Sequence, residues 1–130
     1  MVYSAGTGVI GDEYRAILWK NNTAELLYDK SSFATALYMA GSDLWVTGYY
    51  YYLNGLTDAL VWKNGVLQSE ITGNRFIPVA VYVNEDDVFV AGNSEDGALL
   101  FVNGISQGLN TAPYPYDTIY MIKSMCVIPR

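Results

Sequence analysis

Four consecutive tyrosines, Tyr49, Tyr50, Tyr51 and Tyr52, are the most unusual local feature of the sequence. Aromatic rings with a polar hydroxyl stack on sugars and other flat ligands, so a tyrosine-rich surface can form a binding site. Tyrosine also favours β-strands and packs well across pairs of strands, and this structural role is the alternative. Between these two interpretations the sequence leaves the ligand-binding residues unassigned.

Glu85, Asp86 and Asp87 place three carboxylates in one predicted turn. Calcium prefers such oxygen-rich loops. The corresponding turn at residues 40–43 holds one carboxylate, so only Asp43 and Asp87 recur, and a turn aspartate that caps its own backbone explains both. We therefore predict neither a metal ion nor a cofactor. The other acids near predicted turns are interpreted as solvated residues: Asp12, Glu13, Asp58, Glu95 and Asp96.

The 130-residue chain contains no histidine, which removes the commonest general base and metal ligand. Cys126 is its one cysteine, so neither a disulfide within the chain nor a thiolate metal cluster can form. It lies in the apolar run at residues 125–128 and is predicted to be a buried small hydrophobic residue. No pair of acids has a spacing that indicates glycoside hydrolysis. The sequence therefore predicts no catalytic residue.

Charge and composition exclude several classes of protein. The net charge is −6, and the seven basic residues are scattered, whereas a nucleic-acid partner needs clustered lysine and arginine. No apolar stretch approaches the roughly 20 residues that span a bilayer. A hydrophobic content of 52% with only 15% charged residues excludes a disordered tail.

Three motifs recur at a spacing of about 40 residues, which indicates an internal repeat. The copies are AILWKNN, ALVWKNG and ALLFVNG at residues 16–22, 59–65 and 98–104; VYSAG, LWVTG and VFVAG at 2–6, 44–48 and 88–92; and ALYM, AVYV and TIYM at 36–39, 80–83 and 118–121.

Each repeat resolves into four short strands of nearly continuous apolar sequence, which predicts an all-β protein whose strands are covered on both faces. The Asn-Gly pairs at residues 64–65 and 103–104 predict tight hairpins, because both residues accept a positive φ, and the pair at 54–55 is predicted to turn the hairpin between the second and third strands of the middle repeat. The clearest predicted strands lie near residues 36–39, 44–48, 59–63, 79–83, 88–92 and 98–102, with a weak fourth strand near 105–109.

The period and the four strands match a blade of a β-propeller. We predict one repeat domain over residues 1–130, with three blades at approximately 1–31, 32–75 and 76–110 and a closing strand within 111–130.

Trp19 and Trp62 occupy equivalent positions in the middle of predicted strands of two repeats. Large aromatic side chains at such positions are predicted to pack between neighbouring blades. Lining ligand pockets between blades is the alternative role.

The combination V-x-V-x-G followed by A-x-x-W-K-N-G resembles the propeller-like repeat proteins that are common among secreted and surface proteins of gut Bacteroidetes. The resemblance covers nearly the whole chain, which departs from the pattern at Asn22, where glycine is expected, and at Phe101 and Val102, which replace Trp-Lys. It implies a propeller fold and an extracytoplasmic or cell-surface location. It implies no activity, because the function of these proteins is uncharacterised.

Propellers ordinarily close with four to eight blades, so three blades need a partner. Two copies would give a six-bladed ring, and a two-fold dimer is the commonest oligomer. In such a homodimer the last strand of each chain, near residues 118–121, would complete the first blade of the other.

The sequence favours a non-enzymatic module that binds a ligand or protein or serves as a scaffold. The alternatives are an oligomeric carbohydrate-binding lectin and a hydrolase with its active site in the central funnel. A lectin of this kind predicts equivalent aromatic pockets around the ring, whereas a hydrolase needs one asymmetric cluster of acids.

Overall fold

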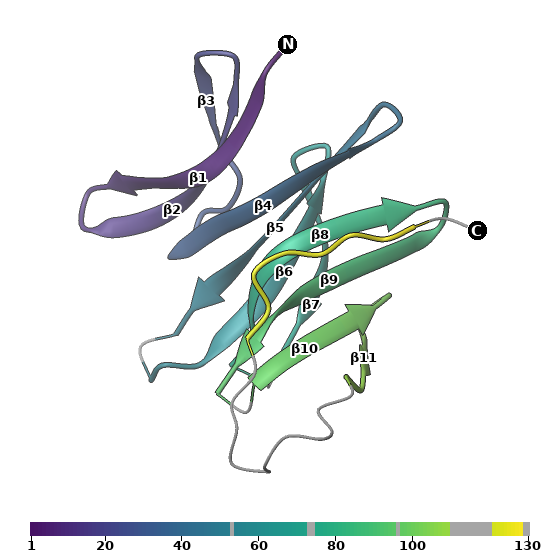
Figure 1. The fold of residues 1–130 in the computed structure, drawn as a ribbon. Helices are drawn as coiled ribbons and strands as arrows, with labels where there is room; N and C mark the ends of the chain where they lie inside the picture. The colour runs from purple at the N-terminus through teal and green to yellow at the C-terminus, as the bar shows by residue number, and fades with distance from the viewer. Residues whose placement is uncertain (53, 73–74, 96, 110–120, 129–130) are drawn as a thin grey trace.

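The structure is a computed structural model of the chain, and it describes residues 1–52, 54–72, 75–95, 97–109 and 121–128. These residues form eleven β-strands and no helix, which confirms the all-β class (Figure 1). Accordingly, the described part of the chain has no helix that could cross a membrane. The strands are β1 Tyr3–Ile10, β2 Glu13–Lys20, β3 Thr23–Leu26, β4 Ser32–Ala40, β5 Asp43–Tyr51, β6 Thr57–Lys63, β7 Val66–Ile71, β8 Ile77–Asn84, β9 Asp87–Ser94, β10 Gly97–Val102 and β11 Ile105–Gln107.

The strands form three separate antiparallel sheets in which consecutive strands are neighbours. Sheet 1 contains β1 to β3, sheet 2 contains β4 to β7 and sheet 3 contains β8 to β11. Figure 1 shows the sheets following one another in chain order, with sheet 2 in the middle. The six clearest predicted strands are all present, as β4, β5, β6, β8, β9 and β10, and each extends beyond its predicted range.

Two of the three predicted Asn-Gly turns form as expected, whereas at residues 54–55 only Gly55 has a positive φ, of 84°. Asn64 and Gly65 have φ values of 52° and 83°, and Asn103 and Gly104 have 52° and 79°. Asparagine tolerates this left-handed region better than other residues with a side chain, and glycine accepts it freely.

The asparagine that begins each of these turns, like Asn21 in sheet 1, also bonds to the strand that lies two strands earlier in the chain, at or next to the start of that strand. In all three sheets, its backbone N–H donates to a carbonyl oxygen at 2.7–2.9 Å, and its Oδ1 accepts from the N–H of that same residue at 2.8–2.9 Å. The recurring asparagine of the sequence motif is therefore a structural clamp. The pairs are Asn21 with Val2, Asn64 with Leu44, and Asn103 with Val88.

Asp43 and Asp87 take part in the same clamps. Asn64 Nδ2 donates to Asp43 Oδ1 at 3.0 Å, and Asn103 Nδ2 donates to Asp87 Oδ1 at 2.9 Å. The prediction that these aspartates cap their own backbone is corrected, because the carboxylates accept bonds from across the sheet.

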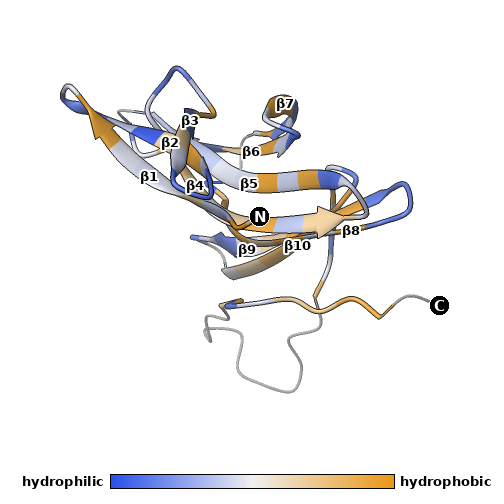
Figure 2. Ribbon diagram, turned by 90° about the horizontal axis from the view of Figure 1, so that it is seen from above, coloured by the Kyte–Doolittle hydropathy of each residue, from blue (hydrophilic) through white to orange (hydrophobic). Residues whose placement is uncertain are grey.

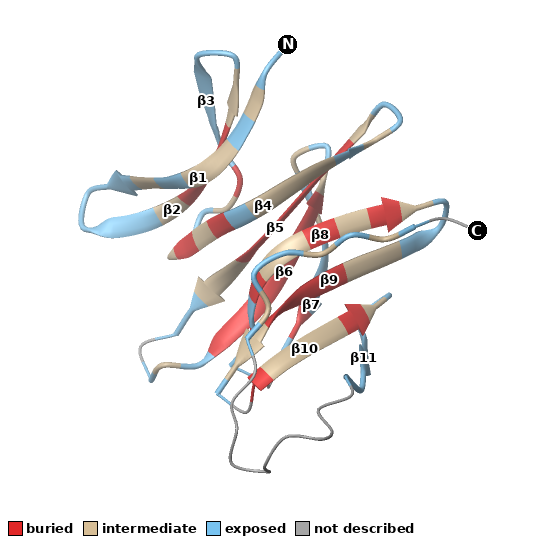
Figure 3. Cartoon of the chain, viewed as in Figure 1, coloured by how far each residue is buried: buried red, intermediate tan, exposed pale blue. Residues whose placement is uncertain are grey.

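Two apolar clusters hold the sheets together, visible as the buried segments of Figure 3. One lies between sheets 1 and 2 and includes Ala16, Leu18, Val46, Leu60 and Trp62. The other lies between sheets 2 and 3, and its main members are Trp45, Val61, Phe76, Val81, Val90 and Phe101. Sheet 2 is thus covered on both faces.

The predicted core role is confirmed for Trp62 and corrected for Trp19. Trp62 is fully buried against sheet 1, and Phe101 at the equivalent position of sheet 3 is buried against sheet 2. Each side chain therefore lies on the front face of its sheet, the face toward the preceding sheet. Trp19 is only half-buried and lies over Gly6, because the described residues provide no sheet in front of sheet 1.

A β-bulge recurs near the start of the first strand in sheets 2 and 3. It falls between Ala34 and Ala36 in β4 and between Pro78 and Ala80 in β8. The residues paired with the bulges are Gly48 and Gly92. Neither position has room for a side chain, since a Cβ atom would overlap the carbonyl oxygens of Phe33 and Ile77, respectively. This close approach of two backbones explains the glycine that ends the second sequence motif.

Residues 121–128 run beside β8 in the same direction (Figure 1) and are largely apolar (Figure 2). They are assigned to no strand. Most of the predicted closing strand near residues 118–121 lies outside the described residues. Cys126 is exposed, so the prediction that it is buried is wrong: its segment lies on the outer side of sheet 3, and nothing described covers it.

Candidate functional site

A cleft of ≈ 630 Å³ opens where the ends of sheets 1 and 2 meet. Its size lies within the range of about 300–1,000 Å³ that is usual for small-molecule sites. Three segments contribute to it: the β1–β2 turn with the start of β2, the connection from β3 to β4, and the end of β5. The lining residues are Asp12, Glu13, Tyr14, Arg15, Asp29, Lys30, Ser31, Tyr50 and Tyr51.

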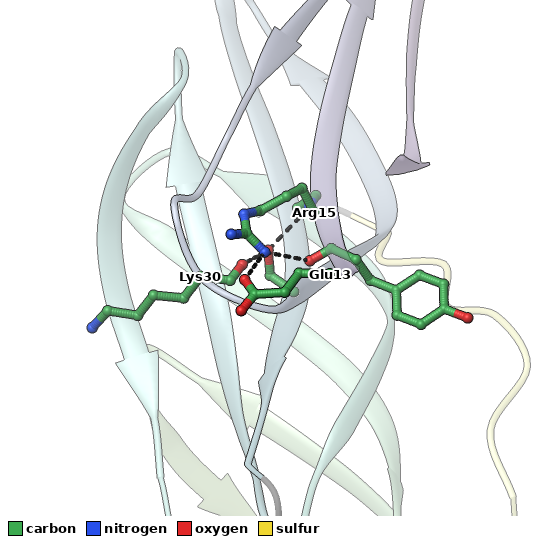
Figure 4. Close-up of polar contacts among 6 residues, drawn as sticks. Glu13, Arg15 and Lys30 are labelled. Atoms are coloured by element: carbon green, nitrogen blue, oxygen red, sulfur yellow. Dashed lines mark hydrogen bonds and ion pairs between the residues drawn. The ribbon is translucent and has the colours of Figure 1, made fainter. Parts of the chain in front are cut away.

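An ion pair forms one wall of the cleft. The guanidinium of Arg15 contacts the carboxylate of Glu13 and donates a hydrogen bond to the carbonyl oxygen of Tyr14 at 3.2 Å (Figure 4). The Arg15 side chain is 16% exposed, whereas that of Glu13 is 56% exposed. Arg15 is therefore fixed in place, and the Glu13 carboxylate remains open to a ligand.

The connection from β3 to β4 is held against β2 by Ser32. Its Oγ accepts the backbone N–H of Ala16 at 3.0 Å and donates to the carbonyl oxygen of Lys30 at 2.8 Å. The backbone carbonyl oxygen of Ser31 accepts the backbone N–H of Tyr51 at 3.2 Å. These bonds fix the backbone from which Lys30 projects, and its side chain extends away from the Arg15–Glu13 pair (Figure 4).

The tyrosine run lies at the end of β5 and the residue after it. Because side chains alternate along a strand, Tyr49 and Tyr51 share one face and Tyr50 and Tyr52 the other. Tyr50 packs against the cluster between sheets 1 and 2, while Tyr51 is 45% exposed at the cleft. The packing role of the run is therefore present for Tyr50, and Tyr51 is exposed at the cleft.

Stacked rings connect the cleft wall to β4 and β5. Tyr14 stacks on Phe33 with ring centroids 5.1 Å apart, and Phe33 stacks on Tyr49 at 4.9 Å. Phe33 and Tyr49 are direct partners across the β4–β5 pair. Burial raises the pKa of Tyr49, with a smaller contribution from Tyr51. Tyr14 itself is 51% exposed, so this column presents an aromatic surface to the cleft.

A second aromatic group lies beneath Lys30. Lys30 Nζ is 5.7 Å from the ring centroid of Tyr28 and 5.9 Å from that of Tyr50, distances typical of cation–π contacts. Tyr28 meets Trp62 edge-on at 6.2 Å. Burial is the main cause that raises the pKa of Tyr28, and the neighbouring Lys30 opposes it.

Asp58 anchors the far end of this group. Tyr52 meets Tyr50 edge-on at 4.5 Å and donates its hydroxyl to Asp58 Oδ2. That hydrogen bond, followed by burial, raises the pKa of Tyr52 to about 12. Asp58 was predicted to be a solvated turn residue, but it is 7% exposed within β6. Its burial is tolerated because the tyrosine hydroxyl satisfies the carboxylate.

The other predicted acids lie in separate regions of the fold. Asp12 and Glu13 are exposed in the cleft, while Glu85, Asp86 and Glu95 are exposed near turns of sheet 3. Asp96 lies outside the described residues. No group of three or more acidic or cysteine side chains in the described ranges could hold a metal ion.

Sequence reasoning missed Arg15, Asp29 and Lys30. None of them belongs to a recurring motif. The cleft brings the segment around Arg15 together with segments that lie about 15 and 35 residues later in the chain. One signal was available. The positions that match Tyr14 and Arg15 in the second repeat hold Thr57 and Asp58, so the pair deviates from its repeat.

The chemistry of the cleft is therefore not repeated between sheets 2 and 3. When the repeats are aligned, Ser94 and Glu95 of the third repeat correspond to Tyr50 and Tyr51 of the second. This differs from the equivalent aromatic pockets that a multi-site lectin would have. Comparisons of the chain with models of protein families, with curated proteins and with solved structures gave no match.

Proposed function

We propose that this chain is a non-enzymatic binding module whose cleft takes a neutral, hydroxyl-rich ligand of the carbohydrate class. The observation that carries the proposal is the combination of two accessible tyrosine rings with an ordered guanidinium and open carboxylates in one cleft. Carboxylates accept and guanidinium groups donate hydrogen bonds, so together they match a ring of hydroxyls. The exposed faces of Tyr14 and Tyr51 match the apolar face of a sugar ring.

The charge balance argues for a neutral ligand. Asp12, Glu13 and Asp29 contribute three negative charges, and Arg15 and Lys30 contribute two positive charges. A strongly anionic ligand would meet three carboxylates, and a cationic ligand would meet both bases. Because the cleft occurs once in the described repeats, each chain would carry one such site.

A glycan array followed by isothermal titration calorimetry of the best ligand tests this proposal. We expect Tyr51→Ala and Arg15→Ala each to weaken binding by about tenfold or more, as expected when a contact that contributes about 1.4 kcal/mol is removed. Asp87→Ala is the matched control, because it changes a carboxylate in sheet 3 that lies outside the cleft. Equal loss of affinity in Asp87→Ala would contradict the site, and release of a cleaved product would favour the hydrolase alternative.

We further propose that the three sheets are propeller blades and that two copies form a six-bladed ring. The supporting observation is Trp19. Its equivalents Trp62 and Phe101 are buried against the preceding sheet, whereas the described residues form no sheet in front of Trp19. The rear face of sheet 3 is apolar as well, with Phe89 and Leu100 half-buried. Two apolar end faces on one chain suit a self-complementary assembly.

Sedimentation equilibrium tests the ring. We expect a dimer at micromolar concentration, and we expect Trp19→Asp to shift the chain toward the monomer while Asp12→Asn, an exposed change elsewhere in sheet 1, leaves it dimeric. A well-folded wild-type monomer would contradict the ring without affecting the proposed cleft ligand.

A further inference from the structure

Sheet 1 has three strands among the described residues, although it carries the glycine that faces the first strand in each of the four-stranded sheets. In sheets 2 and 3 the glycine of the second motif makes room for the bulge of an added first strand, where a Cβ atom would lie 2.8 Å from Ala34 Cα at Gly48 and 2.7 Å from Pro78 Cα at Gly92. Gly6 is the third copy of this glycine, yet a Cβ atom there would meet only the end of the Trp19 side chain, at 3.3 Å. β1 is the open edge of its sheet.

The first strand of each later sheet lies over the sheet before it. Two of the contacts between β8 and sheet 2 mark its position: Thr35 Oγ1 donates to the carbonyl oxygen of Pro78 at 2.7 Å, and the rings of Tyr38 and Tyr82 lie 4.7 Å apart. Residues 121–128 also bond to the sheet before them, but through its second strand, β9, instead of its first. Asn93 Nδ2 donates to the carbonyl oxygen of Ile122 at 2.8 Å, and the N–H of Ile122 donates to Asn93 Oδ1 at 2.6 Å.

These contacts fix a register. Tyr82 lies 44 residues after Tyr38, and Cys126 lies 44 residues after Tyr82. Burial chiefly raises the pKa of Tyr82, and both Tyr38 and Cys126 are close enough to add to the effect. By the same offset Ile122 corresponds to Pro78, and both carbonyl oxygens are bonded from the preceding sheet. Residues 121–128 thus occupy the place of the first strand of a fourth sheet.

We propose that this segment pairs with β1 of a second copy and becomes the missing strand of its sheet 1. Pro78 faces Gly92 and Tyr82 faces Phe89, so the register places Ile122 opposite Gly6 and Cys126 opposite Tyr3 of the second copy. Addition of a strand to an open edge satisfies the backbone groups of both partners. The pairing places the closing strand at residues 121–128, within the range 111–130 expected from the sequence, and it rests on the proposed ring.

A disulfide tests the register. Antiparallel partners have Cα atoms about 4.5–5.5 Å apart, within the range that a disulfide spans. Tyr3→Cys is therefore expected to form an oxidised dimer through Cys126, seen on a non-reducing gel. Val9→Cys lies on the same strand and is 65% exposed, so it controls for random collisions. Tyr3→Cys combined with Cys126→Ser should form no such dimer.

Gly6→Ala provides a second test that does not depend on oxidation. Its Cβ atom fits the free edge after a small shift of Trp19 but would meet the bulge of an added strand. We expect the chain to stay folded and the dissociation constant of the dimer to rise by about tenfold or more.

The outcomes separate the exchanged strand from the ring. An oxidised dimer with Tyr3→Cys alone supports the exchanged strand. An oxidised monomer, or equal cross-linking of Val9→Cys, overturns it. Absence of the cross-link in a chain that still sediments as a dimer overturns the strand exchange and leaves the ring. A wild-type monomer overturns both.

Discussion

Tyr52 and Asp58 make folding stability depend on alkaline pH. Their hydrogen bond holds the pKa of Tyr52 at about 12, whereas the unfolded chain has the ordinary value of 10.0. Between these values the folded chain keeps a proton that the unfolded chain has lost. The contribution to stability is therefore complete below about pH 10 and is lost as the pH rises through about 12.

We expect Tyr52→Phe to remove part of the decrease in the free energy of unfolding between these pH values, as measured by urea denaturation from pH 8 to 12. Asp58→Asn, which removes the charged acceptor, should also flatten the curve. An unchanged alkaline slope in both variants would show that the bond does not contribute.

Trp62 is the largest fully buried side chain of the described residues. We expect Trp62→Ala to lower the free energy of unfolding by about 3–5 kcal/mol, the usual cost of deleting a large buried aromatic residue. Trp62→Phe should lower the free energy of unfolding by less, because it keeps an aromatic ring in the core. It also removes the Nε1–H, which has no hydrogen-bond partner among the described residues. Chemical denaturation measures both. A Trp62→Ala chain that melts like the parent would contradict the core assignment.

At the scale of the strand, the glycines facing the bulges control whether β4 and β8 can pair. Gly48→Ala and Gly92→Ala are each expected to lower the free energy of unfolding by about 1–3 kcal/mol or more, because backbone atoms must move apart. Gly11→Ala, in the β1–β2 turn, offers a different comparison: nothing lies within 4 Å of its Cβ position, but its φ of 65° is unfavourable for alanine. Only the Gly48 and Gly92 variants should lose the protection of β4 and β8 amides in hydrogen exchange.

The asparagine clamps are testable in two sheets at once. Asn64→Gly and Asn103→Gly keep the positive φ but remove the side-chain bonds, and each should cost about 1 kcal/mol per lost net hydrogen bond. Asn64→Ala should cost more, since alanine also disfavours the left-handed turn. Thermal denaturation compares the three. Equal stability of the alanine and glycine variants would contradict the turn-strain part of the argument.

The structure of single sheets was largely predictable from the sequence, whereas the placement of side chains between sheets was not. The Asn-Gly turns and the apolar strands between them are local, so β5, β6, β9 and β10 follow from neighbouring residues. Asp58 is one residue inside β6, and its burial depends on Tyr52 across a hairpin. Trp19 and Trp62 share a motif, yet their burial differs because only one has a sheet in front of it.

The candidate cleft shows the same division. The tyrosine run was visible as an unusual feature, but its partners Arg15 and Lys30 join it only after sheets 1 and 2 have packed. No periodicity predicts such a meeting, since the charged residues lie in a turn region and in a connection between sheets.

At the scale of the whole molecule, the proposed ring makes stability depend on concentration. If apolar end faces are buried only in the dimer, unfolding and dissociation occur together and the melting temperature must rise with chain concentration. We expect this rise in differential scanning calorimetry from 5 to 500 μM, on the order of the shifts that mass action gives. A melting temperature independent of concentration would indicate that the folded monomer is self-sufficient.

The asparagine clamps have a consequence for how such a chain can change in length. Each clamp closes one sheet within itself, and sheet 2 packs one face on sheet 1 and the other on sheet 3. A tandem duplication of residues 32–75 would keep the present interfaces with sheets 1 and 3 and add one new interface, in which the face that now packs on sheet 3 meets the face that now packs on sheet 1. The number of units can therefore change by whole repeats wherever these two apolar faces fit each other.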